Sequence, residues 1–139
     1  MVGLRERPKA VSDGRAETPP IMATLGMKIV WFAEGKVTLS MKVDEKYHNP
    51  MGTLHGGIIT DLAHASMGVA TISTLKEQES FTTLELKMNF FRPFQNDWLT
   101  SEAKVLHRGR KMVRQQTHSM SKGGHSRHSC GDADLSAEF

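Results

Sequence analysis

Hydrophobic and polar residues alternate with a period of two along four stretches of the chain. These stretches span residues 27–31, 36–43, 83–90 and 99–106. Successive side chains of a β-strand point to opposite faces of a sheet, so the alternation predicts four half-buried strands. The Glu34-Gly35 pair predicts a hairpin turn between the first two of them.

A helix is predicted between the second and third of these strands, over residues 58–75. Its apolar residues cover most of the helix circumference, which is typical of a helix that is buried on nearly all sides. An antiparallel sheet that curls around a single helix would bury it in this way. We therefore expect an α+β fold in which a curved antiparallel sheet wraps around one long central helix.

The pattern weakens at both ends of the chain. Residues 1–20 are polar and end in two prolines, so we expect a flexible N-terminal arm. The folded domain is expected over residues 21–113. Residues 114–139 are rich in Ser, Gly, His and Gln and show no clear alternation. This C-terminal segment is atypical of the predicted fold, and we expect the sheet to lack its last strand or strands.

Composition and charge narrow the classes of protein that the chain can represent. A length of 139 residues suits one domain. The net charge of +3, with histidine counted as neutral, fits a solvated basic surface or the attraction of a phosphate-bearing ligand. The basic residues are scattered and few aromatic residues accompany them, which disfavours a nucleic-acid partner.

The single cysteine excludes an intrachain disulfide and fits a reducing cytoplasm, where we expect the protein to reside. No apolar run approaches the ~20 residues that a membrane-spanning helix needs, so no membrane partner is expected. Four potential metal ligands near the C-terminus lack the paired spacing of a zinc site, so no metal is expected. These residues are His118, His125, His128 and Cys130.

A glycine-rich motif, residues 49–57, precedes the predicted helix and ends in Gly56-Gly57. Glycine lets a ligand approach the backbone closely, and a helix N-terminus presents unpaired N–H groups and a partial positive charge. Together these features can form an oxyanion hole for a thioester carbonyl. Glycines also occur at helix starts that bind nothing, so the motif alone leaves both interpretations open.

Three segments carry a resemblance to a known family. They are the motif 52–57, the small-residue segment 65–68, and residues 80–90 followed by Arg92-Pro93. In these segments the chain resembles the hotdog-fold acyl-CoA thioesterases of the phenylacetyl-CoA thioesterase type, over about residues 21–113. The resemblance implies hydrolysis of an acyl-CoA to a free acid and CoA without a cofactor. It also implies a homodimer or homotetramer whose sites form between two subunits.

The resemblance assigns roles to four residues. It implies that the N–H of Gly56 polarises the thioester carbonyl and that the Asn49 side chain helps to position the nucleophile or a water molecule. His55 matches a residue that mainly positions its neighbours. Thr83 matches a hydroxyl residue that orients the attacking water in some relatives, and it would come from the partner chain.

Five further residues are candidates for substrate binding. They are Gly57, Asp61, Arg92, Arg108 and Arg110. The three arginines could bind the phosphates of CoA, since guanidinium groups in basic loops suit that task. An ordinary solvated surface explains them equally well, and Asp61 also fits an exposed or inter-subunit helix position.

His64 stands nine residues after His55, where the family has its catalytic Asp or Glu. Three interpretations remain open. The imidazole could act as the general base that activates water, because a neutral imidazole accepts protons near neutral pH. Alternatively, the chain is a catalytically impaired hotdog protein that binds acyl-CoA or acyl-carrier thioesters, or His64 is a structural residue in a variant without activity. Asp61, three residues earlier, could approach His64 on the same helix face. That proximity is all that would favour a hydratase or dehydratase of this fold.

Overall fold

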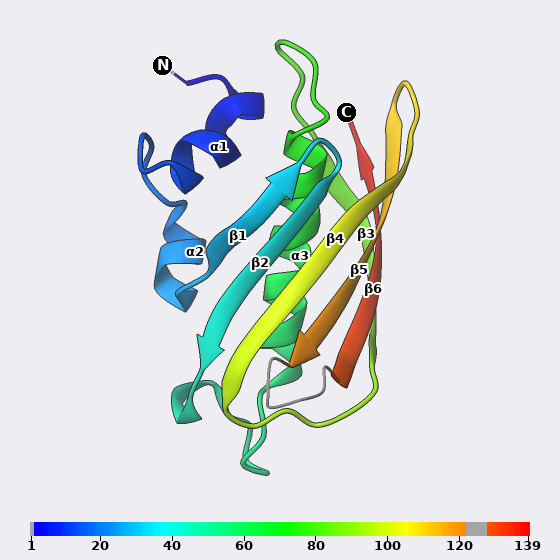
Figure 1. Ribbon diagram of the computed structural model, residues 1–139. Coiled ribbons are helices and arrows are strands. Elements are labelled where there is room, and N and C mark those ends of the chain that lie inside the picture. The colour runs from blue at the N-terminus through cyan, green and yellow to red at the C-terminus, as the bar shows by residue number, and fades with distance from the viewer. Residues whose placement is uncertain (1, 122–127) are drawn as a thin grey trace.

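The computed structural model describes residues 2–121 and 128–139. The described residues form one six-stranded antiparallel sheet with the strand order β1-β2-β4-β5-β6-β3. The strands are β1 (Lys28–Ala33), β2 (Lys36–Val43), β3 (Thr82–Phe90), β4 (Asp97–Arg108), β5 (Met112–Ser121) and β6 (His128–Glu138). Figure 1 shows the sheet curving around one long helix, α3 (Gly56–Ile72). The predicted α+β architecture is confirmed.

In the described part of the chain, three short helices precede the sheet, and a fourth follows β2, before the loop that leads into α3. They are η1 (Leu4–Glu6), α1 (Arg7–Ser12), α2 (Pro20–Leu25) and η2 (Glu45–Tyr47). The first two lie within the stretch that was expected to be a flexible arm. Pro8 and Ala10 of α1 are buried, and Figure 1 shows α1 next to the end of β1. Because these apolar residues are covered, α1 packs on the folded domain and is not a free arm.

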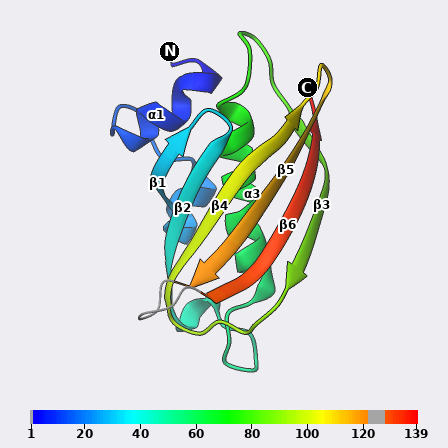
Figure 2. The same cartoon turned by 45° about the vertical axis from the view of Figure 1, so that its right-hand side comes forward.

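The C-terminal segment corrects the expectation from the sequence. Residues 114–121 and 128–138, for which no strand was predicted, form most of β5 and all of β6. These two strands lie inside the sheet, between β4 and the edge strand β3, as Figure 2 shows. The sheet therefore has its last strands, and they connect β3 to the rest of the molecule.

The inward-facing residues of β5 explain why the pattern failed there. After Val113 the buried positions of this strand are the polar residues Gln115, Thr117 and Ser119. The Gln115 side-chain amide donates to the hydroxyl of Thr71 on α3. The hydroxyls of Ser101 and Thr117 are 2.8 Å apart, and Thr117 donates to the carbonyl of Glu102. Hydrogen bonds to neighbours thus allow polar side chains at positions that an alternating pattern assigns to apolar ones.

Helix α3 packs one broad face against the concave side of the sheet. Its buried residues are Ile59, Leu62, Ala63, Ser66, Met67, Val69, Ala70 and Thr71. The opposite side carries a stripe at spacings of four, three and four: Gly57, Asp61 and His64 are exposed, and Gly68 is half-buried. The helix was predicted to be buried on nearly all sides, and its exposed positions are confined to this stripe, which holds the titratable residues Asp61 and His64.

Candidate active site

The loop before α3 is organised by the side chain of Asn49. Its Oδ1 accepts hydrogen bonds from the N–H groups of Met51 at 2.9 Å and Thr53 at 3.3 Å. Its Nδ2 donates to Thr53 Oγ1 at 3.0 Å. Gly52 completes the turn with a φ of +74°, a conformation that favours glycine. In this chain Asn49 therefore shapes the loop that leads into the helix.

His55 caps the N-terminus of α3. Its Nδ1 accepts a hydrogen bond from the N–H of Gly57 at 2.9 Å, so the proton of the neutral ring is on Nε2. A Cβ on Gly57 would lie only 2.8 Å from that nitrogen, which explains the glycine. The N–H of Gly56, in contrast, donates to no residue that the structure describes. The cap thus engages the Gly57 N–H and leaves that of Gly56 as a free donor.

Gly56 and Asn49 line one cavity, which we call the N-terminal cavity. Its volume is about 310 Å³, and it lies between the start of α3 and the end of β3. Its other lining residues are Thr53, Leu54, Ile59, Phe90, Phe91, Arg92, Pro93 and Phe94. A Cβ on Gly56 would lie 3.1 Å from two carbons of the Phe90 ring, so this ring packs against the helix start.

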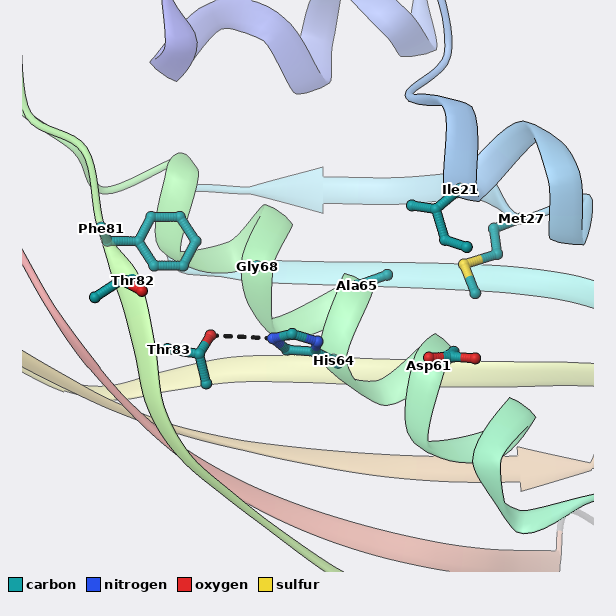
Figure 3. A pocket seen from close by; sticks show the side chains of 9 residues that line it. All are labelled: Ile21, Met27, Asp61, His64, Ala65, Gly68, Phe81, Thr82 and Thr83. Atoms are coloured by element: carbon teal, nitrogen blue, oxygen red, sulfur yellow. Dashed lines mark hydrogen bonds between the residues drawn. The ribbon is translucent and has the colours of Figure 1, made fainter.

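His64 lies in a second cavity of about 500 Å³, which we call the His64 cavity. It is lined by Ile21, Met27, Asp61, His64, Ala65, Gly68, Phe81, Thr82 and Thr83. Figure 3 shows the His64 ring directed at Thr83, and the two atoms Nε2 and Oγ1 are 3.0 Å apart. This contact lies within one chain, whereas the resemblance implied a Thr83 from the partner. An imidazole in contact with a hydroxyl can exchange a proton with it.

The two cavities divide the predicted site residues into two groups. Asn49, Gly56 and Arg92 line the N-terminal cavity, and Asp61, His64 and Thr83 line the His64 cavity. Gly56 and His64 are eight positions apart on α3, which corresponds to about 12 Å along the helix axis. A single chain therefore does not place the free N–H of Gly56 next to the imidazole of His64.

Arg108 and Arg110 lie at the other end of the sheet. Figures 1 and 2 show the β4–β5 hairpin at the end opposite to the start of α3. Arg108 forms an ion pair with Glu79, and its guanidinium lies 3.4 Å from the centre of the Phe139 ring. Arg110 is exposed in the hairpin turn. Neither arginine lines either cavity, so Arg92 is the arginine of the three that lies at a candidate site.

The sequence alone did not indicate most of the walls of the His64 cavity. Ile21 and Met27 come from α2 and the segment after it, and Phe81 precedes β3. No local pattern links these positions to the helix. Gly68 could have been found, because it continues the spacing of Asp61 and His64 along the same helix face.

Among the described residues, no group of three or more His, Cys, Asp or Glu side chains could hold a metal ion. His118, one of the four potential ligands for which no metal was expected, pairs with Asp132. His125 and the side chains of His128 and Cys130 lie outside the described residues. No helix in the described part of the chain has the length and apolar character needed to cross a membrane.

Comparison with known proteins defines the class. Residues 51–122, more than half of the chain, match the family model of the thioesterase superfamily. The chain therefore belongs to the thioesterase superfamily, and its class of enzyme is thioester hydrolase.

Two similar proteins have names that state an activity. The chain is 30% identical to 1,4-dihydroxy-2-naphthoyl-CoA hydrolase of Listeria monocytogenes over 65% of this chain and 73% of that protein. It is 29% identical to the proofreading thioesterase EntH of Klebsiella pneumoniae over 80% of each chain.

Solved structures confirm the hotdog fold. A thioesterase family protein from Silicibacter pomeroyi superimposes with a TM-score of 0.86 at 24% identity, covering 98% of this chain and 97% of that one. The PaaI protein of the phenylacetic acid degradation operon of E. coli superimposes with a TM-score of 0.83 at 20% identity, covering 97% and 94%. At these identities the likeness shows the fold alone.

Proposed function

We propose that this chain hydrolyses acyl-CoA thioesters to a free acid and CoA, with His64 as the general base. The observation that carries the proposal is the His64 imidazole, 3.0 Å from the Thr83 hydroxyl in a cavity with apolar walls. The apolar side chains of Ile21, Met27 and Phe81 suit an acyl group. A relative named as the hydrolase of an aromatic acyl-CoA supports CoA thioesters as the substrate class.

The proposed site combines two copies of the chain. A thioester carbonyl must lie about 3 Å from its oxyanion donor while the base acts on the group that attacks its carbon. Gly56 and His64 of one chain are about 12 Å apart along α3, so they cannot serve the same carbonyl. We therefore assign the oxyanion donor to the Gly56 N–H of a second copy in a homodimer.

Exposed apolar residues on β3 and the loop after it support such a dimer. Leu84, Phe90 and Phe91 have exposed fractions of 53%, 53% and 54%. Side chains of this size at an unpaired sheet edge are normally covered. Phe90, Phe91 and Arg92 also line the N-terminal cavity, so a second copy on this edge would contact both that cavity and β3.

Arg92 is a basic residue that lines the N-terminal cavity. It is exposed, and Gly56 lines the same cavity. A guanidinium in this position can bind a phosphate of CoA while the thioester reaches the helix start. Arg108, which is paired with Glu79, is not used in this proposal.

The test of the base is CoA release from a panel of acetyl-, hexanoyl- and benzoyl-CoA, followed with a thiol-reactive dye. We expect the wild-type chain to turn over at least one substrate and His64→Ala to lose about 100-fold or more in kcat. His107→Ala is the matched control, since His107 is exposed on β4 away from both cavities. If only His64→Asp releases CoA, the natural chain is a thioester-binding protein and not a hydrolase.

The test of the oxyanion donor uses two substitutions of Gly56. Gly56→Pro removes the N–H, and proline is well tolerated at the first position of a helix. His55 before it has φ −62° and ψ 130°, which suits a residue that precedes proline. Gly56→Ala adds the same Cβ beside Phe90 but retains the N–H. We expect Gly56→Pro to be inactive and Gly56→Ala to retain most of the activity.

A mixture of two inactive variants tests whether the site is shared. Dimers that combine one Gly56→Pro chain with one His64→Ala chain contain one intact site, in which each chain supplies the group that the other lacks. Random exchange should restore about a quarter of the wild-type activity. A mixture that stays inactive after verified subunit exchange contradicts the shared site.

A further inference from the structure

We propose that Thr83 is the nucleophile of this hydrolase and that the acyl group passes through an ester with its hydroxyl oxygen. This inference rests on the proposed function. Its starting point is the distance of 3.0 Å between His64 Nε2 and Thr83 Oγ1. A hydroxyl and a base within about 2.6–3.2 Å of each other form the arrangement by which enzymes activate serine and threonine nucleophiles.

The direction of this hydrogen bond depends on the tautomer of the His64 ring. With its proton on Nδ1, the neutral ring presents the lone pair of Nε2 to Thr83, and Thr83 is the donor. Proton transfer from Thr83 to His64 uses this tautomer. Asp61 lies three positions before His64 on α3 and lines the same cavity, and Figure 3 shows it on the side of the His64 ring opposite to Thr83.

The same contact places Thr83 ahead of water. An imidazole nitrogen has a single lone pair, and with the ring proton on Nδ1 the Thr83 hydroxyl occupies that of Nε2. A water molecule would have to displace Thr83 before His64 could remove its proton. In this tautomer the proton in position for transfer is that of Thr83, and Asp61 lines the same cavity as the imidazolium that results.

A break in the regular pairing of β3 directs Thr83 into the cavity. Farther along the strand the half-buried positions are Leu86 and Met88, and regular alternation would continue this set to Leu84. The register with β6 shifts between Thr83 and Glu85, however, and Leu84 is exposed whereas Thr83 is half-buried. A bulge of this kind re-aims a side chain. The backbone irregularity thus serves the hydroxyl that contacts His64.

The reaction has two balanced steps. Thr83 Oγ1 gives its proton to His64 Nε2 and attacks the thioester carbon, the C–S bond breaks, and His64 returns the proton to the departing CoA sulfur. A water molecule then gives a proton to His64 and attacks the ester carbon. The C–O bond to Thr83 breaks, His64 returns the proton to Oγ1, and the free acid leaves. One acyl-CoA and one water yield one acid and one CoA.

The experiment is rapid mixing of the full chain with hexanoyl-CoA and with 4-methoxybenzoyl-CoA, whose electron-donating ring slows hydrolysis of its esters. Acid-quenched samples are examined by intact mass and peptide mapping. We expect a burst of CoA release and an acyl group on Thr83. Thr83→Val keeps a branched side chain suited to a strand, and we expect it to lose the burst and about 100-fold or more in kcat. Thr83→Ser should restore both, and Thr38→Val on β2 should behave as the wild type.

Each outcome decides between the two proposals. Wild-type turnover without an acyl group on the protein, acylation of another residue, or an unchanged kcat in folded Thr83→Val would overturn the covalent step and leave the hydrolase intact. A wild-type chain that releases no CoA from any substrate would overturn the proposed function, and the covalent step with it.

Discussion

Replacing the buried Gln115 with methionine should stabilise the protein. Gln115 is only 1% exposed, and its Nε2 donates to Thr71 Oγ1. Its Oε1 is buried without a hydrogen-bond partner among the described residues. If the positions of the amide oxygen and nitrogen are exchanged, the nitrogen is the atom without a hydrogen-bond partner. A buried polar group without a partner costs about 1–3 kcal/mol, so the substitution removes a standing penalty.

The expected gain follows from three contributions. Methionine has nearly the shape of glutamine and adapts to irregular spaces, so no large cavity or clash is expected. The lost hydrogen bond to Thr71 removes about 1 kcal/mol, but the Thr71 hydroxyl can bond instead to a carbonyl of its own helix. The relieved penalty and the added apolar burial exceed this loss. We expect a net gain of about 1 kcal/mol, which corresponds to a rise of about 3–5 °C in Tm for a domain of this size.

The assay is thermal and urea unfolding at several protein concentrations, because dimerisation would make Tm depend on concentration. Thr117→Val is the matched comparison on the same strand. Thr117 is fully buried and fully paired, and its loss leaves the hydroxyl of Ser101 without its partner. We expect Thr117→Val to lose about 1–2 kcal/mol. A Gln115→Met variant that is destabilised as much as Thr117→Val would refute the reasoning, because both ends of the amide would then be paired.

Three further substitutions test the site and the sheet. Gly57→Ala should displace the His55 ring, because the new Cβ would lie 2.8 Å from its Nδ1; we expect lower kcat/KM with a stability loss within about 1 kcal/mol, checked by kinetics and urea unfolding. Arg92→Gln should raise KM for acyl-CoA several-fold but not for the matching acyl-pantetheine, whereas Arg110→Gln should change neither. Gly131→Ala should lower the free energy of unfolding by about 1–3 kcal/mol, since its Cβ would lie 2.9 Å from a backbone carbonyl oxygen of β3; an unchanged Tm would show that the two strands can separate without cost.

The sequence predicted the parts of the fold in which burial follows a simple period. Residues 36–43 were predicted as a strand and form β2 with the same limits, because every second side chain there is apolar and buried. The helix was predicted at 58–75 and extends over Gly56–Ile72. Helix and strand ends depend on caps and turns, which the alternation of apolar residues does not record.

The alternating pattern missed β5 and β6 for two different reasons. In β5 the buried positions after Val113 are polar, and only their hydrogen-bond partners on α3 and β4 allow this. In β6 the positions 133–138 do alternate, but two of the three buried residues are alanines. Small residues give a weak apolar signal, so the alternation was present but easily overlooked.

The site was only partly predictable. The resemblance pointed to Asn49, Gly56, His64 and Thr83, and the structure places them in two cavities. The alternation over residues 83–90 groups Thr83 with the polar residues of the strand. The bulge that turns it toward His64 depends on pairing with β6, a strand that the sequence did not reveal. A contact between a helix and an irregular strand of this kind has no local sequence signal.

The division of α3 into two faces explains how one helix can serve as both core and site. Residues such as Leu62 and Met67 are fully buried against the sheet, and a truncation to alanine there costs about 2–5 kcal/mol. Asp61 and His64 belong to the exposed stripe and contribute no apolar burial to the core. Substitutions on that stripe should therefore be able to change the chemistry without loss of the fold. It follows that activity and stability should vary independently for substitutions on the stripe and together for substitutions on the buried face.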